Sequence, residues 1–275
     1  MSRLAARFDE LRASHRKAVV PYVVAGDPSP EVTVEILHQL VSAGADVLEV
    51  GVPFSDPMSE GPVIQKGHER ALAHRVSLRA VLSMVGEFRE QDADTPVILM
   101  GYANPVERMG YEDFAQACAA AGVDGLITVD LPPEEVESLN KELKRVDIDN
   151  IFLISPTTPK ERIATIVDSA SGFIYYVAVK GVTGSGNLDA GEVSAQLAEI
   201  RQLTGLPLCV GFGIKDAVSA AAIGAVADGV VVGSALIDTM AQAIAASGRE
   251  AAGIAEAVSL LADIRRGVDG LGSAA

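Results

Sequence analysis

The 275-residue sequence predicts an α/β fold, a single-domain (β/α)8 barrel over residues 1–275 with an extra N-terminal helix. Eight short apolar runs alternate with helical patterns, and each run is almost continuous in apolar residues, as in parallel strands covered by helices. An Ala/Gly-Asp turn recurs before several of these runs. Eight such units in about 250 residues match the size of this barrel. A doubly wound open sheet is the competing architecture.

The elements follow in order along the chain. Residues 1–17 alternate charged and apolar positions, which is typical of an amphipathic helix and differs from a signal peptide or membrane span. Ser29 and Pro30 predict a helix cap and a first-turn proline, before an apolar stripe at Val34, Leu37 and Val41. We expect strands at residues 19–24, 47–50, 97–100, 125–129, 151–154, 173–177, 208–211 and 229–232.

Charge and cysteine usage exclude several classes of function. The formal net charge is -15, and no cluster of Lys and Arg is present, so neither nucleic acid nor an anionic membrane surface is an expected partner. The two cysteines, Cys118 and Cys209, fall within apolar segments, so we expect core positions and a reducing cytoplasm. The histidines, His15, His38, His68 and His74, fall on predicted helices, and we assign them surface roles with no metal site.

Two glutamates flank a loop rich in Pro and Asp. Glu49 stands in an apolar strand, where alternation turns Val47, Glu49 and Gly51 to the barrel interior. Catalytic residues of this barrel lie at strand ends, so Glu49 is a candidate catalyst, and the alternative is an ion pair with a neighbouring Arg or Lys. The loop delivers Glu60 just before a predicted helix start at Pro62, where it is either a second catalyst or a helix-start charge.

Other strand ends also carry polar groups that predict a substrate site. They are Tyr22, Tyr102, Asn104, Asp130 and Tyr175. Each tyrosine has the alternative of being a packed core residue with a hydrogen-bonded hydroxyl. Together these residues are predicted to line one mouth of the barrel.

Glycines after the last two strands predict a phosphate site. Gly211-Phe212-Gly213 ends one strand, and Gly233-Ser234 follows the other at the start of an apolar helix. Glycines allow backbone N–H groups to approach an anion closely, and a helix N-terminus adds partial positive charge. Residues 180–187 predict a mobile lid, in which Gly184 is a further candidate for the phosphate, although a plain loop is the alternative.

The motifs GDPSPE, LEVGVPFSDPMSEGPVIQ, GYANP, GVTGSGN, GFGI and GSA occur in this order along nearly the whole chain. With them the sequence resembles the tryptophan synthase alpha chain family over roughly residues 15 to 265. The resemblance implies a TIM barrel that cleaves indole-3-glycerol phosphate to indole and glyceraldehyde 3-phosphate by a retro-aldol reaction. It implies that Glu49 is the acid and base at the carbon centre, and that the second carboxylate accepts the ring N–H proton. Thr183 is then expected to bond this second carboxylate when the lid closes.

The sequence departs from the family pattern at the second carboxylate, where Asp is usual and this chain has Glu60. The resemblance implies no cofactor in this chain and a pyridoxal-phosphate beta chain as partner in an alpha2beta2 assembly, with Pro53 and Asp56 at the interface. Two alternatives remain open at this point: a Schiff-base aldolase that uses Lys180, and a chain that only activates its beta partner.

Overall fold

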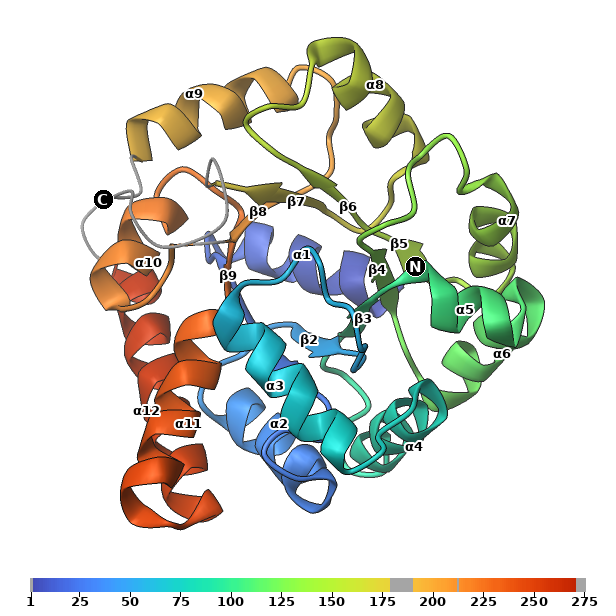
Figure 1. The fold of residues 1–275 in the computed structure, drawn as a ribbon. Helices are drawn as coiled ribbons and strands as arrows, with labels where there is room; N and C mark the ends of the chain where they lie inside the picture. Colours follow the sequence, from blue (N-terminus) through green and yellow to red (C-terminus); the bar gives the residue numbers. More distant parts are fainter. Residues whose placement is uncertain (1, 179–189, 212, 271–275) are drawn as a thin grey trace.

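The computed structural model is a closed barrel of parallel strands surrounded by helices (Figure 1). It describes residues 2–178, 190–211 and 213–270. Within these ranges the strands are β1 (Ala18–Val24), β2 (Leu48–Gly51), β3 (Val97–Gly101), β4 (Gly125–Thr128), β5 (Asp149–Asn150), β6 (Phe152–Ile154), β7 (Ile174–Val177), β8 (Leu208–Gly211) and β9 (Gly229–Val232). This arrangement confirms the predicted fold class.

The expected fifth strand, residues 151–154, is observed as β6, and the two-residue strand β5 precedes it. Hydrogen bonds connect the strands in the order β5-β4-β3-β2-β1-β9-β8-β7-β6, and Ile151 separates β5 from β6. The backbone N–H of Ile151 still donates to Leu126 of β4, whereas β6 pairs with β7. The barrel therefore closes through one segment that changes its pairing partner halfway, and apolar periodicity does not reveal such a change.

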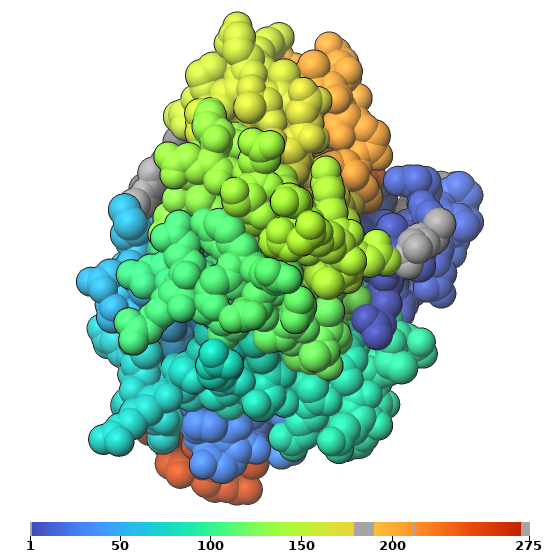
Figure 2. All heavy atoms as spheres, turned by 90° about the vertical axis from the view of Figure 1, so that its right-hand side faces the viewer, coloured from blue at the N-terminus to red at the C-terminus, as the bar shows by residue number. Residues whose placement is uncertain are grey.

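Helices cover the outside of the barrel. The described ones are α1 (Arg3–Ala13), α2 (Thr33–Ser42), α3 (Pro62–Ala73), α4 (Leu78–Arg89), α5 (Ala103–Met109), α6 (Tyr111–Ala121), α7 (Glu137–Arg145), α8 (Lys160–Ser169), α9 (Ala190–Ile200), α10 (Ala217–Gly224), α11 (Ser234–Ser247) and α12 (Glu250–Asp269), with a 3-10 turn η1 (Pro30–Val32). Figure 2 shows one side of this layer, where the green segments around α5 to α7 form the surface. No described helix is both long and apolar enough to span a membrane.

The start of α2 differs from the prediction. Ser29 precedes the 3-10 turn, and its hydroxyl bonds Glu250 instead of capping a helix. The helix proper begins at Thr33, and its buried face is Thr33, Ile36, Leu37 and Leu40, of which only Leu37 belongs to the expected stripe. The extra 3-10 turn shifts the helix phase, which explains the displaced face.

Two apolar clusters divide the molecule into an inner and an outer core. Strand residues such as Val20 and Ile98 fill the barrel interior, and α1 closes one end with Leu4, Phe8 and Leu11. Their neighbours on the strands, for example Leu48, pack outward against the helices. The alternation along β2 is therefore as predicted, and it turns the Glu49 side chain into the interior.

The repeated Ala/Gly-Asp turn has a structural explanation. Each of the three aspartates accepts a hydrogen bond from the backbone N–H near the start of a neighbouring strand and also binds an arginine. The sets are Asp46 with Val19 and Arg265, Asp124 with Val97 and Arg89, and Asp228 with Leu208 and Arg201. These carboxylates satisfy strand N–H groups at the end of the barrel where the strands begin, opposite the predicted site.

Candidate active site

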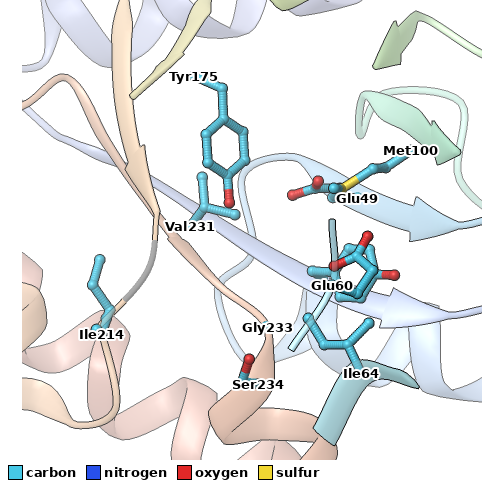
Figure 3. A pocket seen from close by; sticks show the side chains of 11 residues that line it. Glu49, Glu60, Ile64, Met100, Tyr175, Ile214, Val231, Gly233 and Ser234 are labelled. Carbon is cyan, nitrogen blue, oxygen red and sulfur yellow. The ribbon is translucent and has the colours of Figure 1, made fainter. Parts of the chain in front are cut away.

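A cavity opens at the ends of the strands, where the sequence predicts the site (Figure 3). Its polar lining comes from β1, β2, the segment before α3, β7 and the start of α11. The lining residues are Tyr22, Glu49, Glu60, Ile64, Met100, Tyr175, Gly213, Ile214, Val231, Gly233 and Ser234. A mostly apolar cavity with a few converging polar groups is typical of a small-molecule site.

Glu49 is a buried acid with no counter-charge beside it. Its side chain projects from β2 into the cavity and is 1% exposed. Neither carboxylate oxygen has a hydrogen-bond partner within the described part of the chain, so no described Arg or Lys pairs with it. Burial, together with the nearby charge of Glu60, raises the pKa of Glu49 to about 8. Glu49 is therefore mainly protonated at neutral pH and can deliver a proton.

Glu60 lines the same cavity and lies next to Glu49 (Figure 3). Its backbone N–H donates to the Pro57 carbonyl, and its own carbonyl accepts from Nε2 of Gln65, so the segment before α3 is held at both ends. The side chain is 4% exposed, and burial raises its pKa to about 7. A helix-start charge would lie in solvent. The buried position therefore favours the interpretation of Glu60 as a site residue.

The hydroxyls of two tyrosines lie against glycines of the barrel wall. A Cβ on Gly51 would lie 2.3 Å from the Tyr22 hydroxyl, and a Cβ on Gly211 would lie 2.1 Å from the Tyr175 hydroxyl. Both rings are buried and line the cavity. A side chain at Gly51 or Gly211 would therefore collide with a tyrosine ring. These glycines are needed for space at the cavity wall and not only for a turn. Gly211 lies against the Tyr175 ring and is not itself among the residues that line the cavity.

The other predicted substrate residues are not among the residues that line the cavity. Tyr102 accepts a hydrogen bond from the Ser59 backbone N–H and stacks on Phe54 with ring centroids 4.8 Å apart. Asp130 is exposed and accepts from the backbone N–H of Ala103 at the start of α5. Asn104 is also exposed. Tyr102 therefore contacts the segment that carries Glu60, while Asp130 caps a helix.

The structure describes part of the predicted phosphate site. Gly213, with φ +79°, and Gly233 line the cavity, and α11 begins at the adjacent Ser234. A helix N-terminus that faces a cavity offers free N–H groups and partial positive charge to an anion. Phe212, Thr183, Gly184 and Lys180 lie outside the described residues, as does the predicted lid.

The segment between the two glutamates is partly exposed. Pro53 is buried, whereas Asp56 and Met58 are exposed, Met58 by 81%. In the side view of Figure 2 the light-blue residues of this region and the blue N-terminal helix lie at opposite ends of the molecule. Asp56 is thus accessible at the surface, and Pro53 is not.

His68 is a further residue of the site region, and it was not predicted as a site residue from the sequence. The prediction of a surface role is wrong, because the side chain is 2% exposed and contacts both Tyr22 and the backbone of Phe54. It lies on the face of α3 that buries Ile64, Gly67 and Ala71, and the 3.6-residue spacing from Ile64 was the signal that could have found it. His38 is also partly buried against Phe88, whereas His15 and His74 are exposed.

Both cysteines are buried and unpaired, as expected. Among the described residues, no group of three or more His, Cys, Asp or Glu side chains has an arrangement that could hold a metal ion.

Comparisons with known proteins agree on one family. A family model described as tryptophan synthase alpha chain matches residues 8–265. The tryptophan synthase alpha chain of Thioalkalivibrio sulfidiphilus is 62% identical over 242 residues, which cover 88% of this chain and 91% of that protein. The one from Alkalilimnicola ehrlichii is 54% identical over 98% of both chains. Among solved structures, tryptophan synthase subunit alpha from Legionella pneumophila superposes with a TM-score of 0.90 at 46% identity, covering 98% of this chain and 99% of that one.

Proposed function

Since the chain belongs to the tryptophan synthase alpha chain family, we propose that it cleaves indole-3-glycerol phosphate to indole and glyceraldehyde 3-phosphate. The observation that carries the proposal is the pair of buried carboxyl groups in one cavity. Their pKa values, about 8 for Glu49 and about 7 for Glu60, leave one group mainly protonated and the other able to accept a proton near neutral pH.

We propose that the reaction begins with proton transfers at the indole ring. Glu49 donates its proton to indole C3 while Glu60 accepts the proton of the ring N–H, which gives a neutral indolenine. The Glu49 carboxylate then removes the proton of the side-chain hydroxyl next to C3. The C–C bond breaks, its electron pair returns to the ring, an aldehyde forms, and Glu60 returns its proton to the ring nitrogen. No proton is gained or lost overall, so no external acid or base is needed.

The remaining lining residues fit the parts of this substrate. Ile64, Met100, Ile214 and Val231 offer an apolar surface to the indole ring. Gly213, Gly233 and Ser234 are our candidates for the phosphate, with Gly184 and Phe212 as further candidates from the sequence. A phosphate held there would orient the scissile bond toward Glu49, and positioning of this kind supplies a large part of the rate. We assign Tyr22 and Tyr175, which reach the cavity, to the reacting part of the substrate, and Thr183 to Glu60.

We further propose a pyridoxal-phosphate beta chain as partner, which consumes the indole, in an alpha2beta2 assembly. The exposure of Asp56 and Met58 beside Glu60 supports this, because a partner that covers them would also hold Glu60 in place. The chain itself requires no cofactor in this proposal.

Indole release from indole-3-glycerol phosphate, by the isolated chain and by its complex with a beta chain, tests the proposal. We expect slow release by the isolated chain and faster release by the complex. No release from either, combined with normal stimulation of the beta reaction, would instead favour an activator without chemistry of its own. Borohydride trapping at Lys180 is the test of the Schiff-base alternative, and we expect no adduct.

A further inference from the structure

His68 connects the segment after β2 to the cavity. Its side chain projects from α3 and is almost completely buried. The backbone N–H of Phe54 donates to Nδ1 of His68 at 3.0 Å, and Nε2 of His68 lies 3.3 Å from the Tyr22 hydroxyl. One imidazole therefore contacts both the backbone of the segment between the two glutamates and a side chain that lines the cavity.

These two contacts determine where the imidazole proton lies. Nδ1 accepts from the Phe54 N–H, so in the neutral ring the proton is on Nε2 and is donated to the Tyr22 hydroxyl oxygen. Burial lowers the pKa of His68 to about 4, which keeps the ring neutral under physiological conditions. The Tyr22 oxygen then acts as an acceptor toward His68.

The direction of the Tyr22 O–H bond follows from this. Because the His68 N–H already occupies one side of the hydroxyl oxygen, the tyrosine must donate its own proton to a different acceptor. Tyr22 lines the same cavity as Glu49 and Glu60, and its Cα is in register with that of Glu49 across the β1–β2 pair. Neither Glu49 oxygen has a hydrogen-bond partner among the described residues, so the Tyr22 proton is not taken up by Glu49 in this structure and can be donated to a ligand in the cavity. The contact with His68 therefore leaves the Tyr22 proton free to point away from His68.

The other end of this connection is the exposed segment. Phe54 stacks on Tyr102, and the Tyr102 hydroxyl accepts from the Ser59 backbone N–H, so the segment rests on the barrel at two points. Ser55, Asp56 and Met58 between these points are exposed. Movement of this exposed segment would change the distance from the Phe54 N–H to His68, and with it the tautomer that donates to Tyr22.

We propose that His68 is a positioning residue that fixes the donor direction of the Tyr22 hydroxyl in the cavity and couples it to the conformation of residues 53–60. The proposal rests on the function proposed above, because it assigns a role in that reaction. A partner bound to the exposed segment would then change the orientation of the Tyr22 hydroxyl through the hydrogen bond between Phe54 and His68.

The first test does not need substrate, so it remains informative even if indole release fails. Nitrogen-15 NMR of the histidine-labelled chain reports the protonation of each ring nitrogen. We expect a neutral His68 with its proton on Nε2 between pH 6 and 8. A neutral ring with its proton on Nδ1, or an imidazolium in this range, would overturn the proposal. His74, exposed at the end of the same helix, is the internal reference.

The second test separates the two contacts by kinetics. In His68→Asn the side-chain oxygen can replace Nδ1 as acceptor for Phe54 but nothing reaches Tyr22, so we expect kcat to fall about tenfold at unchanged KM, with the stimulation by the beta chain retained. In His68→Gln the amide can replace Nε2 but not Nδ1, so we expect the larger loss in the stimulation. Equal behaviour of the two variants would overturn the coupling to residues 53–60.

A double-mutant cycle with Tyr22→Phe distinguishes positioning from a general structural effect. If His68 acts through the Tyr22 hydroxyl, His68→Asn should have almost no further effect on kcat in the Tyr22→Phe background. Independent, multiplicative effects of the two substitutions would show that His68 is only structural. His74→Asn serves as the matched control and should leave kcat unchanged.

Discussion

Glu49 and Glu60 share one cavity but are held by different parts of the fold. Glu49 stands on β2 in the barrel wall, and Glu60 stands in the segment that leads into α3. The charge of Glu60 contributes to the raised pKa of Glu49, while burial alone accounts for that of Glu60. Two carboxyl groups with separated pKa values form an acid and base pair at neutral pH. The barrel wall positions Glu49, and hydrogen bonds to Pro57 and Gln65 position Glu60.

Shortening Glu60 should lower the rate. The Pro57 carbonyl and Nε2 of Gln65 hold the backbone of Glu60. Glu60→Asp therefore withdraws the carboxylate from the cavity by about the length of one C–C bond, and we expect kcat to fall about tenfold. Glu60→Gln removes the proton acceptor and should cost about 100-fold or more. Single-turnover indole release measures both. Unchanged kcat in Glu60→Asp would show that the position of this carboxylate is not constrained.

Stability should depend on pH through the buried glutamates. A carboxyl whose folded-state pKa is raised binds more protons in the folded than in the unfolded chain, so its contribution to stability falls as pH rises from about 4.5, through about 7 for Glu60 and about 8 for Glu49. Glu49→Gln should therefore increase the free energy of unfolding more at pH 8 than at pH 5, by on the order of 1–3 kcal/mol. Urea denaturation at the two pH values measures it.

Glu87→Gln, at an exposed position of α4, is the control for this effect and should show no such difference between the two pH values. An equal gain for Glu49→Gln at both pH values would mean that Glu49 titrates normally in the folded chain.

Gly211 should tolerate no side chain without moving Tyr175. A Cβ there would lie 2.1 Å from the Tyr175 hydroxyl, and the ring is buried. We expect Gly211→Ala to reduce kcat/KM by about 10-fold or more while the far-UV circular dichroism remains that of the parent. Gly205→Ala is the matched control, because that position has open space around it. Full activity of Gly211→Ala would show that the position of Tyr175 does not affect the reaction.

The barrel could be predicted from the sequence because each strand is an apolar run between helices. The inward direction of the Glu49 side chain could be predicted from the alternation of side chains along a strand. The sequence left Glu60 undecided, since nothing in the local pattern distinguishes a buried loop carboxylate from one at a solvated helix start. The helical spacing from Ile64 could have indicated that His68 is buried, but its contacts with Tyr22 and Phe54 join other elements of the fold and leave no local pattern. The separation of β5 from β6 likewise depends on pairing with two different neighbours.

The most direct test of the proposed chemistry is indole formation by Glu49→Gln in complex with a beta chain. This substitution keeps the shape of the side chain and removes its titrating proton, so we expect kcat for cleavage to fall by about 10³-fold or more. Calorimetry should show binding of indole-3-glycerol phosphate within about threefold of the parent, because the apolar and phosphate contacts remain. Near-normal indole formation by Glu49→Gln would contradict the assignment of Glu49 as the acid and base of the reaction.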